Sequence, residues 1–117
     1  MKDTSNRACA IAAITLLILL APTGWTQTGQ GTVTGLITDS SGAVVPGVQV
    51  RLTEKSTGFV YTPVANEQGL YRAPYLNPGV YEIVFESQGF KKLVHSNIQV
   101  RATETVKVDA SLEVGTV

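Results

Sequence analysis

Residues 105–113 read Thr-Val-Lys-Val-Asp-Ala-Ser-Leu-Glu, and the order of apolar and polar residues in this stretch indicates the class of fold. Its apolar side chains occupy positions 106, 108, 110 and 112, with a polar side chain between each pair. A period of two places the two sets on opposite faces of a β-strand, whereas a helix would distribute them around its circumference. We therefore expect a strand over 104–113 that has one face in a core and the other in water.

The same alternation recurs in two earlier segments, 48–52 and 81–85, where Val84 is the one exception. No segment after Gly31 keeps an apolar period of 3.6 for three helical turns. Glycine-containing turn signals divide this region at regular intervals, a spacing typical of an all-β sandwich or barrel. We expect strands over 32–38, 46–54, 59–65, 70–74, 80–87, 90–94, 97–101 and 104–113.

The first 26 residues have the composition of an export signal. Lys2 and Arg7 precede the segment 8–21, in which only Thr15 is polar. As a helix this segment would span roughly 21 Å, short of the roughly 30 Å hydrocarbon core of a bilayer. We therefore expect a signal-peptide helix that is cleaved after Thr26, with an uncleaved anchor as the alternative. A linker over 27–30, a domain over 31–113 and a tail over 114–117 would follow.

Five short motifs follow one another at consistent spacing after this leader. They are Gly31–Asp39 (GTVTGLITD), Gly42–Val50 (GAVVPGVQV), Asn66–Tyr71 (NEQGLY), Leu76–Tyr81 (LNPGVY) and Gln88–Phe90 (QGF). Together they resemble the carboxypeptidase regulatory-like domain. The resemblance covers residues 31–113 and implies a transthyretin-like, seven-stranded Greek-key β-sandwich.

The leader and the ending Leu112-Glu113-Val114-Gly115 are similar to the amino-terminal extension of Oar-like TonB-dependent outer-membrane receptors. That resemblance implies an exported module in the periplasm or at the periplasmic face of the outer membrane. Its partner would be an envelope protein or an outer-membrane receptor barrel, and only the export signal would engage the membrane. A free-standing module and a fragment of a longer receptor are both compatible with it.

The residue inventory argues against an enzyme and against nucleic-acid binding. Nine Lys and Arg balance nine Asp and Glu, so no basic surface for phosphates is expected. His95 is the sole histidine, too few for the usual zinc site, and we expect it at a strand end or in a loop. The lone cysteine, Cys9, lies in the leader, and no Gly-x-Ser-x-Gly or calcium-loop pattern occurs. We expect no catalytic residue, metal or cofactor.

Two kinds of partner are left: a protein and a polysaccharide. Proline at positions 46, 63 and 74 predicts strands that are edges or that begin at the proline, and such edges or the terminal strand could pair with a partner strand. Sugar binding would need exposed aromatic rings, but four aromatic residues fall at inward positions: Tyr71, Tyr81, Phe85 and Phe90. Three candidates for a ligand platform then stand outside the core: Tyr75, Phe59 and Tyr61.

Overall fold

The computed structural model describes residues 29–115. The predicted leader, the first half of the predicted linker and the end of the tail lie outside the described residues. Eight strands form the domain: β1 (Gly31–Asp39), β2 (Gln49–Glu54), β3 (Val60–Tyr61), β4 (Leu70–Leu76), β5 (Gly79–Glu86), β6 (Leu93–Val100), β7 (Thr105–Lys107) and β8 (Ala110–Leu112). Across residues 29–115 no helix is long and apolar enough to cross a membrane. The all-β prediction is confirmed.

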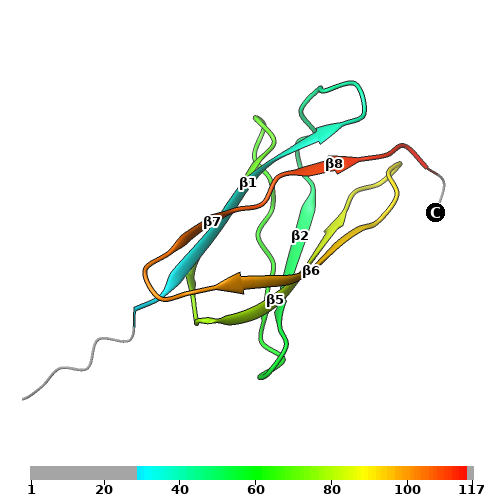
Figure 1. Ribbon diagram of the computed structural model, residues 1–117. Coiled ribbons are helices and arrows are strands. Elements are labelled where there is room, and N and C mark those ends of the chain that lie inside the picture. The colour runs from blue at the N-terminus through cyan, green and yellow to red at the C-terminus, as the bar shows by residue number, and fades with distance from the viewer. Residues whose placement is uncertain (1–28, 116–117) are drawn as a thin grey trace, which may run out of the picture.

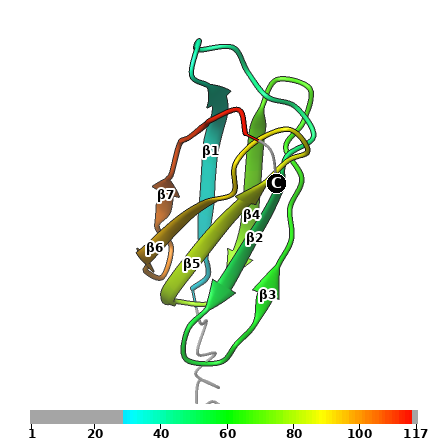
Figure 2. The ribbon, with the colours of Figure 1, turned by 90° about the vertical axis from the view of Figure 1, so that its right-hand side faces the viewer.

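The strands form two sheets that pack face to face as a sandwich (Figures 1 and 2). In the first sheet the order is β4-β1-β7, with β8 also beside β1; in the second it is β3-β2-β5-β6. Strand β1 pairs antiparallel with β4 and parallel with both β7 and β8. The largest fully buried side chains come from both sheets: Tyr71, Tyr81, Phe85, Ile37, Leu52, Leu76, Ile83, Leu112, Val33, Val48, Val50 and Val100.

The alternation read from the sequence corresponds to burial in the structure. Inward positions of β2 and β5 are fully buried, as predicted, and so are the inward positions of β8. Val84, the exception to the pattern, is 3% exposed. Its cross-strand neighbours are Arg51 and Val94, and directly opposed residues share a face of the sheet. Val84 is therefore covered on the outer face by the side chains beside it.

The predicted single strand over 104–113 is wrong, and the sandwich has eight strands where seven were expected. The chain leaves the ladder at residues 108–109, opposite Gly35. A Cβ atom at Gly35 would lie 1.9 Å from the carbonyl oxygen of Val108. The N–H of Val108 donates to the carbonyl oxygen of Thr34 at 2.8 Å, and the N–H of Leu36 donates to Oδ1 of Asp109 at 2.9 Å. The last strand is therefore divided into β7 and β8.

Two expected strands, 90–94 and 97–101, form the single strand β6. The β5–β6 register shifts by one residue opposite Tyr81 and Ile83, and Asn97 has a φ of 59°. Strand β6 therefore has one residue more than β5 at this point, which is a β-bulge. The residues on either side of the bulge still pair with β5.

The strand predicted over 59–65 is shorter in the structure. Regular pairing is confined to β3, and Val64 forms an isolated bridge with Gln49. Pro63 lies between them and has no N–H to donate, so the ladder is interrupted there. Pro74 lies in β4, an edge strand as its sequence predicted.

The end of β2 is held by a carboxylate. Glu54 is 5% exposed and accepts hydrogen bonds from the Ser56 hydroxyl and the Thr57 N–H, both at 2.6 Å, and from the Thr57 hydroxyl. A Cβ at Gly79 would lie 2.6 Å from Oε1 of Glu54, so glycine leaves room for the carboxylate. These hydrogen bonds, from Ser56 first and then Thr57, lower the pKa of Glu54 to about 2.

Gly35→Ala should destabilise the domain by about 1–3 kcal/mol, because the added methyl group collides with backbone that cannot rotate away. Urea unfolding followed by circular dichroism measures the loss. Ser111→Ala, at an exposed site on β8, is the matched control and should change stability by less than about 0.5 kcal/mol. Equal stability of both variants would show that the Val108 carbonyl has room to move.

The stability of the domain should depend on pH through Glu54. Folding lowers the pKa of this carboxyl from 4.5 to about 2, so the unfolded chain binds the proton more tightly. Its contribution is therefore fully present above pH 4.5 and is lost as the pH falls towards 2. Denaturant unfolding at a series of pH values should show a flatter profile for Glu54→Gln, and an intermediate one for Ser56→Ala. An unchanged profile in Glu54→Gln would contradict the assignment.

Candidate functional site

The three predicted platform residues differ in how far they reach into solvent. Tyr75 is 73% exposed and Phe59 is 59% exposed. Tyr61 is half-buried, and its ring lies against Tyr81 with centroids 6.3 Å apart and an interplanar angle of 56°. Tyr61 therefore belongs partly to the core, whereas Tyr75 and Phe59 present free ring surface.

These residues come from two edge strands on the same side of the sandwich (Figure 2). Phe59 directly precedes β3 and Tyr61 ends it, whereas Tyr75 lies on β4 of the other sheet. Tyr75 has a φ of 61°, a left-handed conformation that is uncommon for an aromatic residue. Among residues 29–115 Tyr75 forms no aromatic pair with Phe59 or Tyr61. The structure therefore places the three on one side without stacking them as a single platform.

The side of the molecule that carries these rings is also its most apolar. Nine large apolar side chains of the described chain are exposed, and five of them belong to the segment 59–64 or to β4. We call these five the β3–β4 edge surface: Phe59, Val60, Val64, Leu70 and Tyr75. The residues between β3 and β4 continue along β2, where the Val50 N–H donates to the Pro63 carbonyl at 2.9 Å. The exposed apolar side chains therefore lie on the β3–β4 side of the sandwich.

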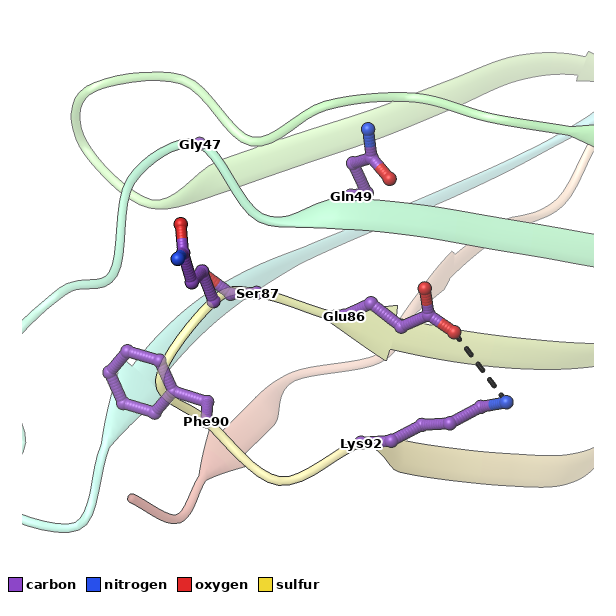
Figure 3. Close-up of a pocket in the computed structure, with 7 residues that line it drawn as sticks. Gly47, Gln49, Glu86, Ser87, Phe90 and Lys92 are labelled. Carbon is purple, nitrogen blue, oxygen red and sulfur yellow. Dashed lines mark ion pairs between the residues drawn. The ribbon is translucent and has the colours of Figure 1, made fainter. Parts of the chain in front are cut away.

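A cavity of about 600 Å³ lies where β2 begins and β5 ends (Figure 3). Its lining combines amide, carboxylate, ammonium and aromatic groups from Gly47, Gln49, Glu86, Ser87, Gln88, Phe90 and Lys92. Nζ of Lys92 lies 3.5 Å from Oε1 of Glu86 across its mouth. The Pro46-Gly47 and Gly89-Phe90 motifs meet here. Both charged side chains are about half exposed, so the cavity is a shallow, wet depression suited to polar contacts.

His95 is the third of the eight residues of β6 and lies within the strand, so its predicted place at a strand end or in a loop is wrong. Its ring meets Phe85 edge to face, with centroids 5.7 Å apart and an interplanar angle of 89°. Nε2 is buried and has no hydrogen-bond partner in the structure. No cluster of three His, Cys, Asp or Glu side chains occurs in the described part of the chain. His95 thus acts as an edge residue of the core.

Two buried tyrosines donate their hydroxyl protons to backbone carbonyls. Tyr71 donates to Val108, and Tyr81 donates to Asn77 at 2.6 Å. Burial raises the pKa of Tyr71 and raises the pKa of Tyr81 to about 12. Both phenols therefore stay protonated and serve as structural donors.

The sequence patterns did not identify Glu54 or Asp109 as structural residues. A signal for Glu54 exists, because it continues the inward series of positions 48, 50 and 52 with a charged residue. A carboxylate at an inward position must find donors, and the following Ser-Thr pair supplies them. Asp109 carries no such signal, since an alternating strand places it on the solvent face.

Comparisons with known proteins identify the domain family and a relative. The model of the carboxypeptidase regulatory-like domain matches residues 32–113. The TonB-dependent transporter Oar of Myxococcus xanthus is 35% identical over 84 residues, which are 71% of this chain. They are only 8% of the transporter, so the chain corresponds to a small part of that protein.

Solved structures with the same fold include proteins of different activities. The TIE protein of Bacillus anthracis has a TM-score of 0.63 at 17% identity, covering 74% of this chain and 17% of its own. A candidate carbohydrate-binding protein of Bacteroides uniformis has a TM-score of 0.59 at 20% identity, covering 72% and 41%. Catechol 1,2-dioxygenase of Pseudomonas arvilla has a TM-score of 0.61 at 12% identity, covering 80% and 55%. Identities this low show a shared fold alone.

The family match spans both sheets, from the second residue of β1 to the residue after β8. It includes the Asn77-Pro78-Gly79 turn beside Glu54 and the close approach of Val108 to Gly35. This chain belongs to the carboxypeptidase regulatory-like domain family.

Proposed function

We propose that this chain is a non-enzymatic accessory module of an exported bacterial envelope protein and acts through contacts with another protein. The partner is an envelope protein or an outer-membrane receptor barrel, met in the periplasm or at the periplasmic face of the outer membrane. The similarity to part of an Oar transporter and the leader-like composition of residues 1–26 support this location. The observation that carries the proposal is the β3–β4 edge surface.

Several exposed apolar side chains lie on the β3–β4 side of the sandwich. Tyr75, Phe59 and Val64 are each more than half exposed. Contiguous apolar surface on a folded domain marks contact with a protein, a membrane or a ligand. Aromatic residues are enriched at protein interfaces, and burying one such ring is worth roughly 1.5–3 kcal/mol. The proposed partner therefore packs against β3 and β4.

The non-enzymatic part of the proposal is supported by the structural roles of the side chains whose pKa values are shifted. Glu54 and Asp39 have lowered pKa values because serine hydroxyls and turn amides donate to them. Tyr71 and Tyr81 donate to carbonyl groups of the core. Each of these groups has a structural task, and each lies in a turn or in the packed interior.

The exposed rings and the similarity to the Oar transporter also support two alternative functions. Carbohydrate binding is favoured by the exposed rings of Tyr75 and Phe59, on which a sugar face could stack. The small share of the Oar transporter that the chain covers is also compatible with a fragment that works only within a longer receptor.

A photo-crosslinking amino acid at position 75 or 59 of the full chain should capture a specific envelope partner in cells. Mass spectrometry of the product should identify an outer-membrane receptor or another envelope protein, because the partner covers this edge. Val44, 46% exposed and outside the β3–β4 edge surface, is the matched control position and should give no such product. Identical products from positions 44 and 75 would contradict a specific interface.

Soluble glycans should leave the tyrosine fluorescence of the purified chain unchanged, because the proposed partner is a protein. Titration with a panel of polysaccharides tests this. A saturable change that is lost in Tyr75→Ala, and kept in Val44→Ala, would instead establish the carbohydrate-binding function and replace the proposed one.

A further inference from the structure

The free edges of the two sheets differ in how well they are protected against pairing with another strand. Strand β3 has two residues and is followed by Pro63, and β4 contains Pro74. Strands β7 and β8 have three residues each. Short strands and prolines are the means by which proteins keep exposed edges unpaired. Three of the four edges are therefore blocked.

Strand β6 is longer, and its bulge at Asn97 protects only the part beyond Ser96. It has eight residues, reads Leu-Val-His-Ser-Asn-Ile-Gln-Val, and pairs only with β5. It contains no proline and no charged side chain. Val94, its second residue, is 46% exposed. The uncharged part of this edge before the bulge at Asn97 is a template for another β-strand.

The register of the sheet shows which backbone groups of β6 point outward. Val50 of β2 directs its N–H away from β5, to the carbonyl of Pro63 at 2.9 Å. Its partner Phe85 must then direct its own backbone groups toward β6, where it pairs with Leu93. The next residue, Val94, therefore turns its N–H and C=O to the free edge. The same alternation gives outward groups at Ser96. Just before the strand, the N–H of Lys91 already donates to the carbonyl oxygen of Glu113 at 2.7 Å.

We propose that β6 pairs antiparallel with β6 of a second copy of this chain, about a two-fold axis at Val94. Residues 93–96 form the straight part of the edge, because β6 begins at Leu93 and the bulge at Asn97 bends the strand beyond Ser96. Val94 is the first residue of that part whose backbone groups point outward, and a two-fold axis there places Val94 opposite Val94 of the partner subunit. The second sheet then continues from one subunit into the other.

A second copy fits this edge because the edge is complementary to itself. A two-fold axis brings the same strand from both subunits together, so a charge near the axis would face its own copy. Between residues 93 and 100 there is no charge. In the register centred on Val94, Lys92 lies opposite Ser96 of the partner subunit, so no like charges are opposed. The exposed Val94 side chains cover each other.

This interface is separate from the one under the proposed function. Figure 2 shows β6 and β3 at opposite ends of the second sheet. The dimer would leave the β3–β4 edge surface free on both subunits, so either interface can fail without the other.

Sedimentation velocity of the full chain over a concentration series tests the dimer. We expect a dimer in the unmodified protein and a monomer for Val94→Lys, because two ammonium groups would be opposed at the axis. Val44→Lys is the control, since Val44 is also 46% exposed but lies outside β6. It should keep the dimer. Circular dichroism and melting temperature establish that each variant is folded.

Ser96→Pro is a second variant, which tests whether the backbone hydrogen bonds of β6 form the interface. It removes an outward N–H from β6 and leaves the bonds between β6 and β5 in place, so it should also yield a monomer. A monomeric unmodified protein at every concentration would overturn the proposal. So would a dimer that persists in both Val94→Lys and Ser96→Pro, or a β6 edge that pairs only with a strand of another envelope protein.

Discussion

The sandwich depends on the close approach of the Val108 carbonyl to Gly35. Strand β1 is the centre of the first sheet and pairs with β4 on one side and with β7 and β8 on the other. At Gly35 the backbone of the last segment lies where any other residue would place its Cβ. The Tyr71 hydroxyl donates to the same carbonyl, so β4 and the last segment are joined across β1. One glycine thus permits the contact that ties the end of the domain to its beginning.

Tyr71, which donates to the Val108 carbonyl, is also the first of three aromatic rings that pack in series through the core. Tyr71 of the first sheet meets Phe85 of the second edge to face, with centroids 5.5 Å apart, and Phe85 meets His95 in the same way. Edge-to-face packing is favoured for aromatic rings and adds to the free energy of burying them. This line occupies the space between the sheets from β4 to β6. Binding groups are therefore confined to the edges, the strand ends and the outer faces.

The sequence predicted the strands that have one buried face, because burial on one side imposes a period of two. It failed where the backbone departs from that period. The division between β7 and β8 depends on a hydrogen bond from Leu36 to Asp109, a contact between residues 73 positions apart. The bulge at Asn97 merged two predicted strands into β6, and asparagine is only one of several residues that tolerate a positive φ. Neither interaction leaves a local pattern in the chain.

The candidate surface was predictable to a similar extent. Tyr75 and Phe59 could be placed outside the core by elimination, because the inward positions were already taken by other aromatic residues. Tyr61 was harder to place, since it contacts Tyr81 only because β3 lies beside β2. The contrast between β6 and the other edges required the topology, because a strand's own sequence does not show whether it has one neighbour or two.

The two lateral edges of the sandwich carry different surfaces. The packed core, the turn at Glu54 and the close approach at Gly35 leave little freedom inside. Proteins of unrelated activity have this sandwich in common. What distinguishes one member from another must therefore lie on its edges. Here one edge exposes Phe59 and Tyr75, and the opposite edge exposes an uncharged backbone. The first suits side-chain contacts with a different molecule, and the second suits hydrogen bonding to a strand like itself.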